Sequence, residues 1–246
     1  IIERRLSVLG QADRRILGAA AILGRQLDLT LLRHIVVNNP DYGRTDLEHW
    51  LSVCSNAAII ELSDEKWRFT HDKIRQGVLH QIADDDRARF HRQAAEAIEA
   101  LYEDRANYAA ALMYHWHHAG DQHKEAEYAS LAGHFAVELG MYQDALDLLN
   151  RAIELYDALK LDDPQRYIDD HYELARSYMN QGAFNDALRV CDIVLKLARA
   201  QNDEKRLVDV YTLQGSLALR QGRPDAANRL LTEALSLARS VGDLTA

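Results

Sequence analysis

The chain has 246 residues and a net charge of −9, with 29 Lys and Arg against 38 Asp and Glu. Such an acidic chain repels phosphate, which argues against direct nucleic-acid binding. No apolar run approaches the roughly 18–20 residues of a membrane span. The two cysteines, Cys54 and Cys191, lie among apolar residues at helical spacing. We therefore expect buried, reduced thiols in a cytoplasmic protein that does not contact a membrane.

Residues 1–83 predict helices followed by a β-hairpin. The expected helices cover 11–23, 29–37 and 45–55, the last with Leu47, Trp50, Leu51 and Cys54 on one face. A β-branched stretch at 58–62, a turn at 63–66 and alternating rings at 67–71 predict the hairpin, and 72–83 return to helix. We interpret three helices and a hairpin as a winged-helix-like domain.

Residues 84–106 form a connection, with an amphipathic helix expected over 87–102. The following helix carries His115, His117 and His118, and His123 comes after a turn. His115 and His118 are one helical turn apart and could share a metal, but no Cys or acidic residue stands at a convincing spacing for a further ligand. We interpret the cluster as a polar inter-helix face beside Trp116, and predict no metal site.

Residues 107–246 contain an internal repeat. Gly140, Gly182 and Gly222 recur at spacings of 42 and 40 residues. Each glycine suits the left-handed end of a helix. A ring follows two residues later, and an alanine that lets two helices approach follows three residues after that: Tyr142 and Ala145, Phe184 and Ala187, Pro224 and Ala227. We expect stacked helical hairpins, a degenerate one before them, and an array that continues beyond Ala246.

This pattern resembles the tetratricopeptide repeat, in units longer than the usual period of about 34 residues. The tryptophan of the standard motif and most closing prolines are missing. Such long repeats look like those in the sensor domain of the bacterial maltose-regulon activator. The resemblance implies an α-α superhelix whose groove takes a protein partner or a small-molecule inducer. The implied groove residues are Asp169, Tyr172, Arg176, Met179 and Asn180 in one repeat, and Asp209, Thr212, Ser216, Leu219 and Arg220 in the next.

Three N-terminal stretches, 16–29, 69–79 and 89–101, occur in this order before the repeats. They resemble the region that follows the ATPase core in signal-transduction ATPases with numerous domains (the STAND class), which include large LuxR-type regulators. His71-Asp72 resembles the Met-His-Asp motif of nucleotide-binding immune receptors, with Thr70 in place of Met. The resemblance implies that His71 reaches the β-phosphate of ADP held by an upstream nucleotide-binding domain. Asp72 is expected to cap free amides at the start of the helix.

The sequence contains no GxxxxGK[ST] phosphate-binding loop, and no catalytic constellation is evident. We therefore expect a mainly α regulatory fragment that is not an enzyme and holds no cofactor itself, while ADP or ATP binds elsewhere in the parent protein. The array would receive a signal and the winged helix would relay it. One alternative is a scaffold without a switch. A second is a winged-helix DNA-binding regulator, although residues 45–55 contain no Lys or Arg and the hairpin offers only Lys66 and Arg68.

Overall fold

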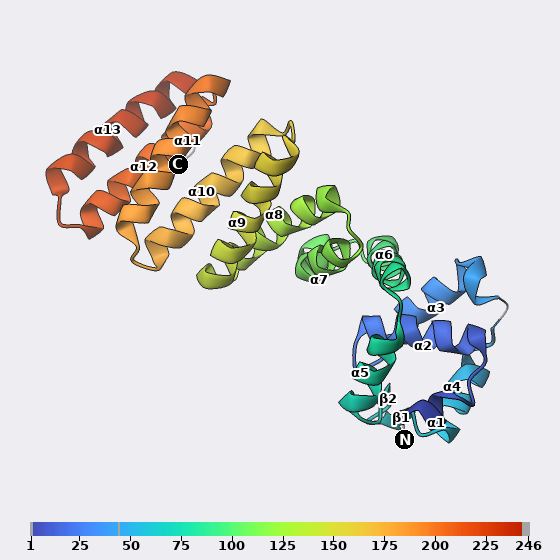
Figure 1. The fold of residues 1–246 in the computed structure, drawn as a ribbon. Helices are drawn as coiled ribbons and strands as arrows, with labels where there is room; N and C mark the ends of the chain where they lie inside the picture. Colours follow the sequence, from blue (N-terminus) through green and yellow to red (C-terminus); the bar gives the residue numbers. More distant parts are fainter. Residues whose placement is uncertain (1, 44, 243–246) are drawn as a thin grey trace. The chain divides into compact units, whose positions relative to one another are not determined.

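The structure is a computed structural model that describes residues 2–43 and 45–242 (Figure 1). The chain divides into two compact units, Ile1–Gln122 and His123–Ala246. We call them the N-terminal and C-terminal units and describe each by itself. The boundaries at 83 and 106 were drawn from sequence motifs rather than from packing, and they stay predictions. The expected continuation of the array beyond Ala246 lies outside the described residues.

The N-terminal unit has the order of helices and hairpin expected from the sequence. Its elements are α1 (Ile2–Leu6), α2 (Gln11–Leu23), α3 (Leu29–Val37), the 3-10 turn η1 (Pro40–Tyr42), α4 (Leu47–Asn56), β1 (Ile60–Ser63), β2 (Lys66–Phe69), α5 (Asp72–Gln81), α6 (Asp84–Leu101) and α7 (Arg105–His118). Helix α4 begins two residues later than expected because the Asp46 side chain caps it by accepting a hydrogen bond from the Glu48 amide at 3.0 Å.

The hairpin pairs β1 with β2 in antiparallel register, Ile60 opposite Phe69. Asp64 and Glu65 at its tip both have positive φ, 51° and 61°. Two such residues in succession form the two-residue turn that matches the twist of the flanking strands. The first strand is shorter than expected because Ala58 also adopts positive φ, 53°, and leaves the extended conformation. The hairpin prediction is confirmed; the winged-helix interpretation stays a prediction.

The core of the N-terminal unit is built around α2. Ile16 and Leu17 are buried, as are the alanines that follow them. A Cβ placed on Gly18 would lie 2.7 Å from the Phe90 ring of α6, so α2 and α6 pack closely at that point. The Trp50 side chain from α4 is fully buried, and its indole N–H donates to the Asp13 carbonyl at 3.1 Å. This core fixes the relative positions of α2, α5 and α6.

The C-terminal unit consists of helical hairpins that stack in chain order (Figure 1). Its helices are α8 (Gln122–Glu138), α9 (Tyr142–Leu159), α10 (Pro164–Asn180), α11 (Phe184–Gln201), α12 (Glu204–Arg220) and α13 (Pro224–Val241). The turns lie at Gly140, Gly182 and Gly222, whose φ angles are 73°, 80° and 70°. The left-handed turns that the glycine spacing predicts are confirmed, and with them the helical superhelix.

The small residues of the repeat are the places where helices touch. Ala145, Ala187 and Ala227 are buried. A Cβ on Gly133 would lie 2.7 Å from the Leu149 side chain, and one on Gly215 would lie 2.7 Å from Leu231. The middle repeat has Ala175 at the equivalent position, also fully buried. The contact between the two helices of a hairpin therefore has room for at most a methyl group.

Both cysteines are buried and unpaired, as expected from their spacing. Burial raises the pKa of each thiol to about 12. A thiol that stays protonated is a poor nucleophile, so neither cysteine is a reactive group. Within the described residues, no helix has the length and hydropathy that crossing a membrane requires.

Candidate partner-binding groove

The ten predicted groove residues belong to α10 and α12, the first helices of two successive hairpins. The same positions on α8 lie 42 residues before those of α10: Glu127, Ser130, His134, Val137 and Glu138. We call the surface formed by these positions on α8, α10 and α12 the first-helix groove. The α8 residues were not included in the sequence-based set, although the spacing between Gly140 and Gly182 would have found them.

A cavity of about 550 Å³ lies along this groove between α8 and α10. Four of the five α8 groove positions line it. The full lining is Glu127, Ser130, Leu131, His134, Glu138, Asp163, Gln165, Arg166 and Asp169. Of the ten residues predicted from the sequence, only Asp169 is in this lining. The hollow part of the groove thus lies one repeat earlier than the positions we inferred.

Arg206 joins three of the predicted residues across two repeats. Its guanidinium pairs with Asp169 of α10 and with Asp209 of its own helix at 3.2 Å, and it lies 4.5 Å from the centroid of the Tyr172 ring. Burial raises the pKa of Tyr172 to about 12, and it also raises the pKa of Asp209, against the lowering effect of Arg206. Arg206 itself was missed, because only the folded register brings it against the preceding repeat.

The other predicted residues lie along the same surface and bond only within their own helices, not across repeats. The Arg176 guanidinium bonds both carboxylate oxygens of Glu173, at 2.8 and 2.7 Å. Asn180, Thr212 and Ser216 donate to carbonyl groups of their own helices. Met179 is half-buried, whereas Leu219 and Arg220 are exposed. The structure therefore makes one connected polar cluster, around Arg206, and leaves the remainder as separate contacts.

A buried carboxylate lies beneath the α8–α10 cavity. Asp170 is fully buried, and its Oδ1 accepts hydrogen bonds from Ser130 Oγ at 2.6 Å and from His134 Nε2 at 2.8 Å. Burial lowers the pKa of His134, but the hydrogen bond and charge of Asp170, with Glu173 and Asp169, outweigh it, so the pKa is raised. Serine and histidine share one oxygen of Asp170. This arrangement positions His134 in the groove and does not activate the serine.

The rim of the cavity is acidic. Glu127, Glu138, Asp163 and Asp169 contribute carboxylates, whereas Arg166 is the only lining residue with a permanent positive charge. Three of these carboxylates have a basic neighbour: Asp163 lies 3.7 Å from Arg166 Nε, Glu127 lies 3.6 Å from Lys124 Nζ, and Asp169 pairs with Arg206. Glu138 has no ion pair among the described residues. The carboxylate of Glu138, which no basic side chain of the described residues neutralises, favours a cationic group at this rim.

His71 and Asp72, the residues expected to act at nucleotide, lie at the start of α5. His71 is the N-cap residue and is exposed, and within the described residues its imidazole makes no hydrogen bond. Asp72 does not cap backbone amides as we expected. Its carboxylate accepts from Gln76 Nε2 at 2.8 Å and lies 3.9 Å from Arg75. Asp72 is already helical, and capping needs the extended conformation of the residue before it.

The histidine cluster includes His91 of α6, which the sequence analysis did not group with it. His115 and Trp116 are buried, and His115 Nδ1 lies 3.0 Å from Nδ1 of His91 in α6. His117 and His118 are exposed. In the described part of the chain, no group of three His, Cys, Asp or Glu is placed to hold a metal ion.

Residues 168–240 match the family model of the tetratricopeptide repeat. The matched range runs from α10 into α13. The part of α10 to α13 within this range is similar to tetratricopeptide repeats. Arrays of tetratricopeptide repeats present extended concave surfaces that typically bind protein partners. The comparison with curated proteins gives no match.

Several solved structures are similar. BtubC from P. vanneervenii has 13% identity and a TM-score of 0.50, over 95% of this chain and 93% of that one. MamA has 17% identity and a TM-score of 0.41, over 66% of this chain and 98% of that one. A STAND protein with a tetratricopeptide repeat sensor from Pyrococcus horikoshii has 14% identity and a TM-score of 0.43, over 96% of this chain and 45% of that one. At 13% identity, the likeness to BtubC shows a shared fold alone.

Proposed function

We propose that the first-helix groove binds an extended segment of a partner protein, and that a Lys or Arg of this segment enters the cavity between α8 and α10. The observation that supports this proposal is the Glu138 carboxylate at the rim of the cavity, whose lining has four acidic residues and one arginine. Glu138 is exposed, and within the described residues its carboxylate has no ion pair. The groove is open and polar, which suits a peptide better than a small apolar inducer.

Selection of peptides from a random library displayed on phage, with the whole chain as bait, tests this proposal. We expect enriched peptides to carry Lys or Arg, and to lose at least about tenfold in affinity for the Glu127→Gln/Glu138→Gln variant. The matched control is Asp147→Asn/Glu233→Gln, which removes two exposed charges from the second helices α9 and α13. Enriched peptides without basic residues, or equal binding to both variants, would refute the proposal.

We further propose that this chain is the sensor region of an ATP-dependent regulatory switch, in which the N-terminal unit relays partner binding to a nucleotide-binding domain. The support is the resemblance of the stretches around residues 16–29, 69–79 and 89–101, together with an exposed His71 whose imidazole is free to contact another group. A scaffold would use the same groove but would have no need of His71.

ADP retention by the complete protein separates the switch from the scaffold. We expect His71→Ala to release ADP faster and to raise basal activity, because the imidazole would no longer contact the β-phosphate. His49→Ala is the control, since His49 is another exposed histidine of the N-terminal unit, on α4. If both variants keep ADP as the unsubstituted protein does, the switch proposal fails and the scaffold is preferred.

A further inference from the structure

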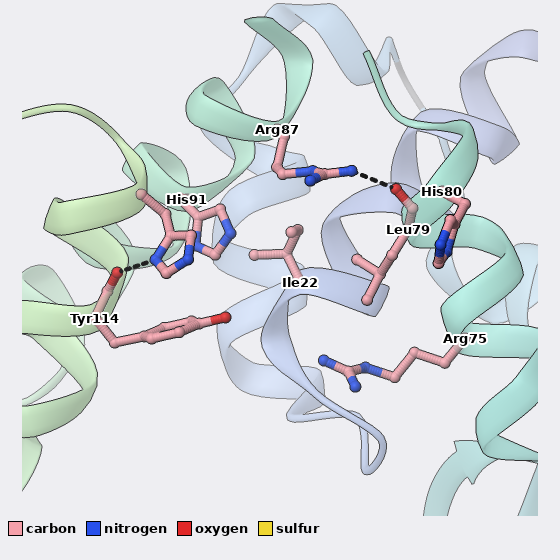
Figure 2. Close-up of a pocket in the computed structure, with 8 residues that line it drawn as sticks. Ile22, Arg75, Leu79, His80, Arg87, His91 and Tyr114 are labelled. Carbon is pink, nitrogen blue, oxygen red and sulfur yellow. Dashed lines mark hydrogen bonds between the residues drawn. The ribbon is translucent and has the colours of Figure 1, made fainter. Parts of the chain in front are cut away.

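A second hollow, of about 310 Å³, lies within the N-terminal unit among α2, α5, α6 and α7 (Figure 2). We call it the basic hollow. Its lining residues are Ile22, Arg75, Leu79, His80, Arg87, His91, Tyr114 and His118. None of these residues is acidic. Neither His71 nor any residue of the first-helix groove contributes to it, so it is a separate feature of the molecule.

Two guanidinium groups face this space from different helices (Figure 2). Arg75 Nε donates to the Ala21 carbonyl at 2.8 Å, and Arg87 Nη2 donates to the Leu79 carbonyl at 2.8 Å. Each acceptor lies in the last turn of a helix, so both arginines are held in place by the backbone. A guanidinium has five N–H donors. Each of these bonds therefore uses one of the five donors of its guanidinium.

The two arginines have few acidic neighbours. Asp72 Oδ1 lies 3.9 Å from Arg75, too far for a hydrogen bond. Asp86, near Arg87 in sequence, pairs instead with Arg89 at 2.6 Å. Arg87 Nε is buried without a hydrogen-bond partner in the described part of the chain. A buried charged donor without a partner is costly, so Arg87 Nε, with the Arg75 guanidinium facing the same cavity, points to an anion held between the two arginines.

The opposite wall is a stack of rings. The centroids of the His91 and His118 rings lie 4.7 Å apart, and their planes form an angle of 23°. The centroid of the Tyr114 ring lies 4.2 Å from that of His118. His118 Nδ1 donates to the Tyr114 carbonyl at 2.8 Å, which fixes the ring. The Tyr114 hydroxyl points away from its own helix toward the hollow (Figure 2). This wall offers a phenol donor and one imidazole edge, and no negative charge.

We propose that the basic hollow binds a small phosphate-bearing molecule, with Arg75 and Arg87 neutralising the phosphate and the Tyr114 hydroxyl donating a further hydrogen bond. Planar guanidinium groups match phosphate oxygens in pairs. A volume of about 310 Å³ is at the lower end of ligand pockets, which limits the ligand to a phosphate or pyrophosphate group with little attached.

Calorimetric titration of the whole chain with pyrophosphate at low salt tests the proposal. We expect saturable binding that weakens at least about tenfold in Arg75→Gln and in Arg87→Gln. Arg92→Gln is the matched control, because Arg92 lies on α6 with Arg87 but its guanidinium lies 5.4 Å from the Trp116 ring, outside the hollow. Equal affinity in the Arg87 and Arg92 variants would refute the proposal.

Two further measurements keep the test decisive if the arginine variants fail to fold. In the unsubstituted chain, NMR signals of the His91 and His118 rings should shift during the titration, whereas those of His49 and His123 should not. Tyr114→Phe, which removes only the hydroxyl of a 48% exposed residue, should weaken binding by a few-fold. Equal shifts at all four histidines would indicate non-specific binding and refute the site. A phosphoserine-containing model peptide that binds much more tightly than pyrophosphate would overturn the small-molecule assignment.

Discussion

At the scale of single residues, Asp170 of α10 links its repeat to the preceding one. Its fully buried carboxylate accepts from Ser130 and His134, both on α8. Its Oδ2 is buried without a hydrogen-bond partner among the described residues. The carboxylate therefore depends on the two α8 donors, and His134 in turn is held at the edge of the cavity. Replacing Asp170 would alter both the α8–α10 contact and the charge of the groove.

Asp170→Asn should lower the pKa of His134, which NMR titration of the histidine rings measures. The pKa of His134 is raised because the hydrogen bond and charges of its acidic neighbours outweigh burial. A raised pKa stabilises the fold below the pKa of the unfolded chain, and this stabilisation is lost as the pH rises through the folded value. Asp192→Asn on α11 is the control. An unchanged titration of His134 in Asp170→Asn would contradict this assignment.

His91 and His115 should make the chain sensitive to acid. Their Nδ1 atoms are 3.0 Å apart, an arrangement that needs one nitrogen without a proton. Burial and neighbouring cations lower the pKa of His91 to about 3, and burial and His118 lower that of His115 to about 4. The unfolded chain takes up protons below about pH 6.5, so stability should fall from there toward the folded values.

Between about pH 7 and pH 5, the free energy of unfolding should fall by about 1 kcal/mol per pH unit for each histidine. Urea unfolding at several pH values measures this. His91→Asn should reduce this dependence, because it removes one titrating group and keeps a polar side chain. His49→Gln, at an exposed position on α4, should leave the dependence unchanged. A pH dependence that is the same in His91→Asn as in the unsubstituted chain would show that the pair is not responsible.

At the scale of elements, the contact between α8 and α9 depends on a glycine. Gly133→Ala should lower the free energy of unfolding by about 1–2 kcal/mol, as measured by urea unfolding. Overpacking costs about 1–3 kcal/mol, whereas the higher helix propensity of alanine offsets about 1 kcal/mol or less of this. The added Cβ would lie 2.7 Å from Leu149, which is fully buried, and 3.3 Å from its backbone nitrogen.

Gly215→Ala on α12 provides the comparison. Its Cβ would also lie 2.7 Å from a leucine, Leu231, but that side chain is partly exposed and can move. We therefore expect a smaller loss of stability, close to neutral. A Gly133→Ala chain as stable as the unsubstituted one would show that the helices can separate at this point without cost.

The elements were largely predictable because their signals are local. The glycines at the turns and the buried alanines follow from spacing alone, as does the hairpin from its β-branched and aromatic residues. What could not be predicted depends on contacts between distant residues. Arg206 meets Asp169 only when two repeats stack. The basic hollow combines residues from Ile22 to His118. The capping role given to Asp72 was wrong because the helix begins at that residue.

At the scale of the whole molecule, the two units carry different kinds of site. The C-terminal unit offers an acidic groove, and the N-terminal unit offers a small basic hollow. The chain has a net charge of −9, so a cationic partner segment gains from long-range attraction as well as from the groove. Association of a basic peptide with the groove should therefore slow as salt is raised, while the dissociation rate changes less. Stopped-flow measurements at several salt concentrations check this expectation.

The central claim is that a partner contacts the first helices of the repeats. Hydroxyl-radical footprinting of the whole chain, with and without a phage-selected peptide, tests it most directly. We predict that oxidation of Tyr172, Met179 and Leu219 decreases when the peptide binds, whereas oxidation of Met141, which is 48% exposed before α9, stays the same. Protection of Met141 with no change at Tyr172 and Met179 would contradict the account.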